Sequence, residues 1–357
     1  MKIVDSNPYY LPFIGGIELR MEELAKRMAS RGHDVTILTS RLPDTDEEEK
    51  KDGYRIIRVK SKFINIYNPP HVKSYNVYET LQSLDADIVN YNYRWSPSWN
   101  KAMNKYDGKK IFTYHNMWGE GMGVVGAISK INDNHFARGL KKYGRIISVS
   151  EYVRNDLVAR GFSPDIMEVI PPGYDCGPIN NAEEDNFILS LGRLVKTKGL
   201  DYLIEAMKEV DCKLVMCGRG PEEKHIRRLI TKYKLEDKVK MLGFVDDDTK
   251  KRLMSTCKFF VMPSLFESFG LAALEQMALN KPLVYSNVNG LPWVVQNGGL
   301  KVEPKDSKEL AKAMNKLLAD DTLRLELGVN ARKRAESFDW NDIVKKYETF
   351  LQNYADE

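Results

Sequence analysis

The sequence has little of what would place a protein in a membrane or outside the cell. Its 357 residues include only four cysteines, Cys176, Cys212, Cys217 and Cys257, whose spacing fits neither a metal site nor a disulfide framework. Because three of them lie in or beside apolar runs, we expect buried thiols. No apolar run approaches the ~20 residues that span a bilayer. The first residues, MKIVDSNPYY, show no signal-peptide pattern, so we expect a cytoplasmic protein.

The sequence also has no large excess of positive or negative charge. The formal net charge is only +4, and the basic residues are dispersed, which argues against a nucleic-acid partner. One basic segment, with Arg138, Lys141, Lys142 and Arg145, is typical of an exposed helix face. The alternative that it faces anionic headgroups at the inner face of a membrane stays open.

The sequence offers only weak candidates for metal ligands. Asp44 with Asp46 and Asp85 with Asp87 have the spacing of ligand pairs. The first pair lies in the charged segment 44–52, which we predict to be a solvated loop, and the second precedes a strand. We therefore predict no metal site.

What the sequence does contain is a repeated alternation of short apolar runs and helical patterns. This alternation predicts an α/β protein with doubly wound parallel sheets. A helix is expected after Gly15 and Gly16, with Leu19, Leu24 and Met28 facing inward. The length suits about two domains. The run Pro171-Pro172-Gly173 is the expected linker between them.

The stretch 258–285 places two carboxylates and a glycine between a buried strand and a helix. The amides of Gly270 and Leu271 would lie at the start of that helix, where an anion such as a diphosphate binds. Glu267 precedes the helix, and Glu275 lies roughly 8 Å along it from Gly270. A nucleotide sugar, with hydroxyls on both sides of its diphosphate, would use both carboxylates. The alternative is that Glu267 caps the helix and Glu275 is solvated.

Two cations are expected in the same crevice. Arg193 and Lys198 follow the predicted strand 187–191, where they would neutralise a diphosphate leaving group. Gly218 and Gly220 form another strand-to-helix turn. A third glycine is missing there, which argues against a dinucleotide-binding fingerprint.

The first half offers candidates of a different kind. The pair Gly15-Gly16 suits either close approach to a ligand or a tight turn, and His115 should lie at the carboxyl end of a strand. Rings are dense between residues 91 and 118, and we nominate Trp95 and Trp118 as acceptor contacts because sugars stack on aromatic faces. The alternative is that these rings belong to the core.

The spacing of Glu267 and Glu275, with Phe-Gly between them and Pro-Ser before them, resembles the signature of the retaining GT-B glycosyltransferases of family four. The segment GGIELRMEELAKRMASRGHDVTIL is similar to the usual opening of that family. The resemblance covers nearly the whole chain. It implies two facing Rossmann-like domains with an interdomain cleft: an acceptor-side domain at 1–172 and a donor-binding domain at 173–338. A closing helix at about 339–357 would cross back onto the first domain.

The resemblance also implies roles for single residues. Catalytic roles fall on Glu267 at the donor sugar, His115 beside it, and the phosphate-binding pair Arg193 and Lys198. Donor-binding roles fall on the glycine loop near the reaction centre, the turn near the base, the helix start and the ribose-binding carboxylate: Gly15, Gly16, Gly218, Gly220, Phe269, Gly270, Leu271 and Glu275. No metal or other cofactor is implied, since the nucleotide sugar is a substrate. Trp293 departs from the family, which usually has an acidic residue there.

The function implied is transfer of a sugar from a UDP- or GDP-sugar to a hydroxyl of a glycan or lipid-linked acceptor, with retention of configuration. A nucleotide-sugar epimerase or a phosphorylase-type lyase of the same fold is an alternative. So is a non-catalytic sugar-binding protein, although a binder has little need of a diphosphate clamp. A nicotinamide dehydrogenase is disfavoured because its fingerprint is absent.

Overall fold

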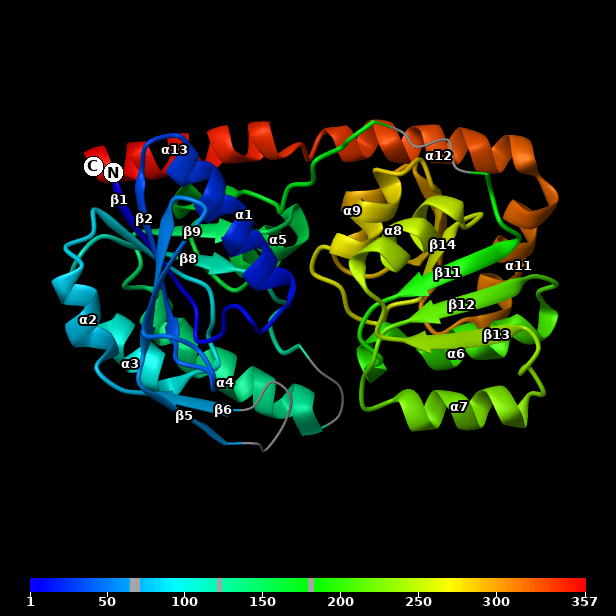
Figure 1. Cartoon of the computed structure of the whole chain (residues 1–357), viewed down its shortest axis with the longest axis horizontal. Helices are drawn as coiled ribbons and strands as arrows, with labels where there is room; N and C mark the ends of the chain where they lie inside the picture. The colour runs from blue at the N-terminus through cyan, green and yellow to red at the C-terminus, as the bar shows by residue number, and fades with distance from the viewer. Residues whose placement is uncertain (65–70, 121–123, 179–182) are drawn as a thin grey trace. The chain divides into compact units, whose positions relative to one another are not determined.

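The chain folds into two compact units (Figure 1). The computed structural model describes residues 1–64, 71–120, 124–178 and 183–357. Unit 1 comprises Met1–Pro172 together with Asn341–Glu357, and unit 2 comprises Gly173–Trp340.

Unit 1 contains, within its described residues, an eight-stranded sheet with the order β10-β9-β8-β7-β1-β2-β4-β3. Its strands are β1 (Lys2–Ser6), β2 (Asp34–Ser40), β3 (Glu48–Lys51), β4 (Tyr54–Val59), β7 (Ile88–Tyr91), β8 (Lys110–Tyr114), β9 (Arg145–Ser148) and β10 (Met167–Val169). Neighbours pair in parallel, except β3, which is antiparallel to β4. A separate antiparallel pair is formed by β5 (Ser61–Ile64) and β6 (His71–Ser74). The chain builds outward from β1 in both directions, so the strand order reverses between β1 and β7.

The edge strand β3 corrects one expectation. The charged segment 44–52 is not a loop throughout, because Glu48–Lys51 pair with β4. Its side chains remain largely exposed, and Glu49 accepts a hydrogen bond from Arg58 at 2.8 Å. Charged side chains are common on edge strands, since they keep water on both faces and discourage further pairing.

The helices of unit 1 are α1 (Gly16–Ser30), α2 (Val77–Ser83), α3 (Pro97–Lys105), α4 (Val124–Leu140), α5 (Glu151–Ala159) and most of α13 (Trp340–Asp356). Leu24 and Met28 of α1 are buried as predicted, but Leu19 is 40% exposed. The buried face of α1 runs through Met21, and Leu19 lies roughly 200° around the helix from it. Helix α13 returns to unit 1, where Glu348 binds His33 at 2.7 Å and Arg31 at 2.6 Å.

Unit 2 contains, within its described residues, a six-stranded parallel sheet with the order β13-β12-β11-β14-β15-β16. Its strands are β11 (Phe187–Leu191), β12 (Lys213–Cys217), β13 (Val239–Gly243), β14 (Phe260–Met262), β15 (Leu283–Ser286) and β16 (Gly299–Val302). Its helices are α6 (Leu200–Ala206), α7 (Glu223–Lys232), α8 (Asp247–Thr256), α9 (Leu271–Met277), α10 (Leu291–Val295), α11 (Ser307–Ala319) and α12 (Asp321–Glu336), with short turns η2 (Lys196–Lys198) and η3 (Met207–Glu209). Another such turn, η1 (Pro164–Ile166), lies in unit 1.

The strand order in unit 2 reverses between β11 and β14. In open α/β sheets, ligands bind at the carboxyl ends of the strands on either side of such a reversal. The two units therefore present one such edge each, at β1 and β7 in unit 1 and at β11 and β14 in unit 2. The predicted α/β fold class with doubly wound sheets is confirmed.

Candidate active site

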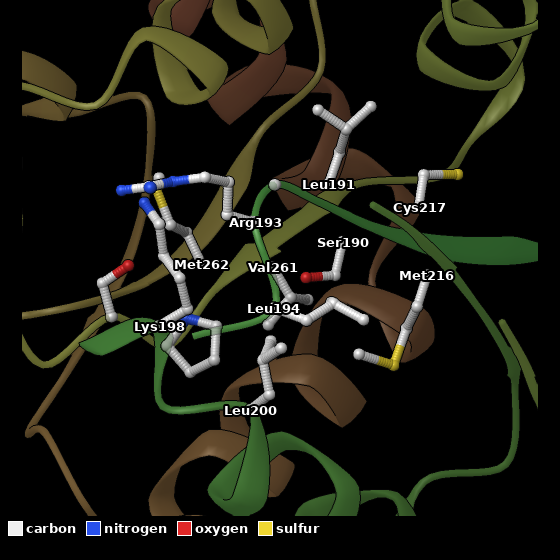
Figure 2. A pocket seen from close by; sticks show the side chains of 13 residues that line it. Ser190, Leu191, Arg193, Leu194, Lys198, Leu200, Met216, Cys217, Val261 and Met262 are labelled. Carbon is white, nitrogen blue, oxygen red and sulfur yellow. The ribbon is translucent and has the colours of Figure 1, made fainter. Parts of the chain in front are cut away.

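The crevice of unit 2 gathers the two predicted cations. Arg193 follows β11 after a single glycine, and Lys198 ends the turn η2. Both line a pocket together with Met262 of β14 and the two residues after it, Pro263 and Ser264. Figure 2 shows their side chains extending toward the same side of that pocket, away from Met216 and Cys217. The pocket thus holds two positive groups at the sheet edge where ligands bind.

Glu267 joins this pair through an ion pair. The Nζ atom of Lys198 donates to Oε2 of Glu267, and the two side chains are only 25% and 14% exposed. The backbone holds the two segments together, because the Leu265 amide donates to the Thr197 carbonyl at 2.7 Å. The Gly290 amide donates to the Glu267 carbonyl at 3.0 Å. Lys198 and Glu267 are therefore held side by side by their backbones as well as by their charges.

The turn into α9 has the expected form. Gly270 has φ +97°, and a Cβ at this position would lie 2.8 Å from Cδ2 of Leu291, so a side chain is excluded for two reasons. The Ala273 amide makes the first helical hydrogen bond, to the Gly270 carbonyl at 2.9 Å. The amides of Gly270 and Leu271 lie ahead of that bond, where an anion would meet them.

Glu275 is held differently from Glu267. It does not line the pocket of Arg193 and Lys198, and its carboxylate binds Nζ of Lys250, on α8, at 2.8 Å. The structure therefore brings Arg193, Lys198 and Glu267 together and gives Glu275 a separate cation. Lys250 was not predicted from the sequence, because it lies 25 residues from Glu275 and their proximity leaves no local sequence signal.

The glycines after β12 have a structural explanation of their own. A Cβ on Gly218 would lie 1.8 Å from the Gly192 carbonyl oxygen, and one on Gly220 would lie 2.2 Å from that of Leu194. The two loops are also joined by a hydrogen bond, in which the Leu194 amide donates to the Arg219 carbonyl at 2.9 Å. These glycines let the loops after β11 and β12 touch, and so position Arg193.

The ring of Phe269 belongs to an aromatic cluster. It is 3% exposed and packs against Trp293 and Phe338, with ring centroids 6.3 and 5.5 Å away. Arg334 lies over the Phe338 ring at 4.4 Å and over the Trp293 ring at 5.3 Å. Trp293, which departs from the family pattern, is thus a packing residue, and any donor contact at Phe269 would use its backbone.

In unit 1, His115 lies at the carboxyl end of β8 and forms a hydrogen bond with the side chain of Asn92. The side-chain nitrogen of Asn92 donates to Asp5 at 2.6 Å and to the Ser6 carbonyl at 3.1 Å. Its oxygen therefore faces His115, whose Nε2 lies 2.8 Å away and must be the donor. The proton is held on Nε2, and Nδ1 keeps its lone pair.

The surroundings keep this imidazole neutral. Burial lowers the pKa of His115 well below its usual value, and the positive charges of Arg20 and Arg94 lower it further. Asp5, at the other end of the chain of hydrogen bonds, has its pKa raised to about 6 by burial, against the opposing effects of Asn92, Arg20 and Asn90. The neutral His115 can therefore accept a hydrogen bond at Nδ1 while its Nε2–H stays bound to Asn92.

The glycine loop before α1 encloses a buried acid that the sequence analysis missed. Glu18 is 4% exposed and accepts a hydrogen bond from Asn7 Nδ2 at 3.0 Å. A Cβ on Gly15 would lie 2.5 Å from Oε2 of Glu18, so the glycine leaves room for the carboxylate. Gly16 is the first residue of α1. An acid in the first turn after a glycine pair was the available signal, because helix starts favour negative charge.

The aromatic residues divide into core and surface. Tyr91, Trp99 and Tyr114 are at most 1% exposed. For these three rings, the alternative that they belong to the core is therefore correct. Trp95 and Trp118 are partly exposed. Trp118 lies beneath Arg160, whose guanidinium is 4.7 Å from the ring centroid. Their contact with an acceptor stays a prediction.

Three of the cysteines, Cys212, Cys217 and Cys257, are buried free thiols, as expected, and Cys176 is partly exposed. Among the described residues, no group of three or more His, Cys, Asp or Glu side chains is arranged to hold a metal ion. In that same part of the chain, no helix is both long and apolar enough to cross a membrane.

Comparison with known families gives two adjoining matches. Residues 14–177 match the model described as Glycosyltransferase Family 4, and residues 177–334 match the one described as Glycosyl transferases group 1. An uncharacterized glycosyltransferase of Methanocaldococcus jannaschii is 29% identical, over 100% of this chain and 99% of its own. The N-acetyl-alpha-D-glucosaminyl L-malate synthase of Bacillus anthracis is 26% identical, over 95% and 94%. An Anabaena protein solved in complex with UDP-glucose matches the fold with a TM-score of 0.82 at 19% identity, over 99% and 100%.

Proposed function

The chain belongs to the GT-B glycosyltransferases of family 4 type, and from that premise we propose that it transfers a sugar from a UDP- or GDP-sugar to a hydroxyl of a glycan or lipid-linked acceptor. The transfer would proceed with retention of anomeric configuration and without a metal ion. The Bacillus anthracis relative is named as a synthase of an N-acetyl-alpha-D-glucosaminyl compound, which supports a sugar as the group transferred. The Anabaena neighbour was solved with UDP-glucose, which supports a nucleotide-sugar donor.

The observation that carries the proposal is the grouping of Arg193, Lys198 and Glu267 at the reversal between β11 and β14. Breaking the anomeric bond develops negative charge on the diphosphate and positive character on the sugar. Fixed cations aimed at the diphosphate stabilise that charge, and they stabilise it most where water is excluded. A diphosphate arriving beside Lys198 would share that cation with Glu267. The Glu267 carboxylate could then accept a hydroxyl of the donor sugar.

The neutral imidazole of His115 suits a contact to the sugar rather than to the phosphate. With Nε2–H bound to Asn92, its Nδ1 can accept a hydrogen bond from a sugar hydroxyl. A cationic imidazole would instead repel the positive character that develops on the ring. We assign His115 to sugar positioning, and Arg193 and Lys198 to the leaving group.

Retention requires either two displacements or attack on the face from which the leaving group departs. Two displacements need a carboxylate nucleophile at the free face of the sugar. We propose no residue for that role, because the Glu267 carboxylate is assigned to a hydroxyl of the donor sugar. The proposal is therefore same-face attack, in which the leaving phosphate takes the acceptor proton.

The test combines binding with product release. Thermal shift against UDP-, GDP- and ADP-sugars identifies the donor, because a ligand at about 100 times its Kd stabilises the native state by about 2.7 kcal/mol. Release of nucleoside diphosphate is then measured with and without acceptors. A glycosyltransferase releases it at speed only with an acceptor. Conversion of the donor without any acceptor would indicate an epimerase or lyase, and stabilisation by free sugars alone would indicate a binding protein.

A further inference from the structure

The loops that follow β7 and β8 at the ligand edge of unit 1 are joined at two places. Asn92 of the first loop binds His115 of the second. Two residues further along each loop, Nη2 of Arg94 donates to the Met117 carbonyl at 2.9 Å. Because neighbouring parallel strands present their following loops at the same edge of the sheet, both contacts influence where His115 lies.

Arg94 is itself held by a buried acid on α4. Its Nε and Nη2 atoms donate to the two carboxylate oxygens of Asp133, and the two side chains are 4% and 0% exposed. Asp133 in turn accepts a hydrogen bond from the Gly119 amide at 2.7 Å. The pair therefore holds the loop after β8 at two points, the carbonyl of Met117 and the amide of Gly119, and ties that loop to α4.

The backbone at Gly119 is adapted to this contact. Its φ of +67° lies in the left-handed region, and a Cβ there would lie 2.6 Å from Cγ of Lys130. At the other end of the segment, the Arg94 guanidinium lies over the ring of Tyr114, the last residue of β8, 5.1 Å from its centroid. The contacts of Arg94 and Asp133 therefore restrain the chain from the end of β8 to Gly119, and His115 lies within that segment.

A buried ion pair is weak evidence for stability. The desolvation of two charges costs about as much as their attraction contributes, so a well-packed apolar pair of similar size is often tolerated. An apolar pair cannot, however, bind a carbonyl and an amide in fixed directions. The charge of Arg94 also reaches the site, because the pKa of His115 is lowered by burial first, then by Arg20 and then by Arg94.

We propose that Arg94 and Asp133 are a positioning pair for the transfer reaction, which holds the segment 115–119 so that His115 meets the donor sugar in one orientation. The inference rests on the proposed function, since it assigns the pair a part in that reaction. Both side chains are buried, so they act through other residues and not by touching a substrate. Arg94 acts on His115 through the loop and through its charge, and Asp133 acts through Arg94 and Gly119.

The test uses the full-length chain and replaces the pair by apolar residues of similar size, in the double variant Arg94→Met/Asp133→Leu. No charge of the pair is left without its partner, so Tm should stay close to that of wild type. The kcat/KM for transfer should nevertheless fall about a hundredfold, as expected for a small misplacement of a positioned group. The Gly119 amide should exchange with solvent roughly tenfold faster, because its acceptor is lost.

The control is Arg324→Met, which removes a buried arginine of α12 in unit 2. Its partner Glu184 keeps a second cation, Lys281, at 3.0 Å, so this variant also leaves no buried charge unpaired. Transfer by Arg324→Met should equal that of wild type.

A second variant separates the charge of Arg94 from its hydrogen bonds. Arg94→Lys keeps the positive charge but cannot bind Asp133 and the Met117 carbonyl in the geometry of a guanidinium. ¹⁵N NMR of the imidazole should then give a pKa of His115 as low as in wild type, whereas the double variant should give a higher one. Transfer by Arg94→Lys should lie between that of wild type and that of the double variant.

The proposal is overturned if the double variant keeps its Tm and transfers like wild type, or if Arg324→Met loses transfer to the same extent. Should the double variant fail to fold, full transfer by Arg94→Lys overturns it. If the wild-type chain transfers no sugar, the proposed function has failed. In that case, an unchanged exchange rate at Gly119 and an unchanged pKa of His115 in the double variant would show separately that the pair does not hold the loop.

Discussion

The ligand edges of the two units are built from opposite kinds of polar group. In unit 1, His115 and Asn92 lead to a single buried carboxylate, Asp5, and the contacts are hydrogen bonds of fixed direction. In unit 2, partly exposed charges form two ion pairs, Lys198 with Glu267 and Lys250 with Glu275. Under the proposed function, the first arrangement would orient hydroxyl groups of the sugar, and the second would exchange partners when the diphosphate arrives. Both edges lie where the strand order of their sheet reverses, and they differ in the polar groups placed there.

The largest expected effect comes from removing charge at the edge of unit 2. Lys198→Ala should lower kcat/KM for transfer by about 10²–10³-fold, or about 3 kcal/mol, because a preorganised donor to the leaving group is lost. Steady-state kinetics with saturating acceptor measure this. Lys196→Ala, an exposed lysine on the same turn, is the control. Equal losses in the two variants would place the effect in the turn and not in the cation.

The next effect lies in unit 1 and is one of stability. The pKa of Asp5 is raised to about 6 from 3.8, so the native state holds a proton that the unfolded state has released between these values. Unfolding then becomes easier as pH rises from about 4 to about 6, and the stability lost amounts to about 3 kcal/mol at 1.36 kcal/mol per pKa unit. Asp5→Asn removes this term, so the stability of the variant relative to wild type should increase over that pH range.

Urea unfolding followed by hydrogen exchange in unit 1 peptides checks this prediction. Asp107→Asn is the control, since Asp107 is exposed on the same unit. Parallel pH profiles for wild type and Asp5→Asn would mean that Asp5 is ionised in the native protein throughout, contrary to its burial.

A smaller effect is expected from the carboxylate at the edge of unit 2. Glu267→Gln keeps the shape of the side chain but loses a charge-assisted contact, which is worth about 2 kcal/mol, or about thirtyfold in turnover at saturating donor. Glu236→Gln, at an exposed position of the same unit, should have no effect. Unchanged turnover in Glu267→Gln would remove this residue from the mechanism.

Much of the secondary structure could be predicted because it depends on the pattern of neighbouring residues. The strand expected at 187–191 and the glycine turn into α9 both appear, since burial periodicity and helix starts depend on neighbouring residues. The predictions failed where contacts with residues distant in the sequence determine which side chains are buried. Leu19 was expected inside, but the face of α1 is set by what lies beneath it.

The missed site residues share that cause. Lys250 meets Glu275 across two helices, and Asn92 meets Asp5 across neighbouring strands 87 positions apart in the chain. No sequence window contains both partners of such a pair. The buried Glu18, by contrast, left a local signal in the first turn of α1, but that signal is shared by many ordinary helix starts.

The smallest energetic effect is expected at Asn92, and it gives the sharpest test of how unit 1 differs from unit 2. Asn92→Ala removes the acceptor that holds the proton of His115 on Nε2, and it costs about 1 kcal/mol of stability through the lost hydrogen bonds. ¹⁵N NMR of the imidazole should show the Nε2–H tautomer in wild type and a mixture of tautomers in the variant. The exposed Asn155→Ala is the control, and His115→Gln identifies the signal. If the tautomer is unchanged in Asn92→Ala, some other group orients His115. The hydrogen bonds from Asp5 through Asn92 would then not determine which nitrogen of His115 carries the proton. If the tautomer changes while transfer does not, the orientation is real but His115 has no part in positioning the sugar.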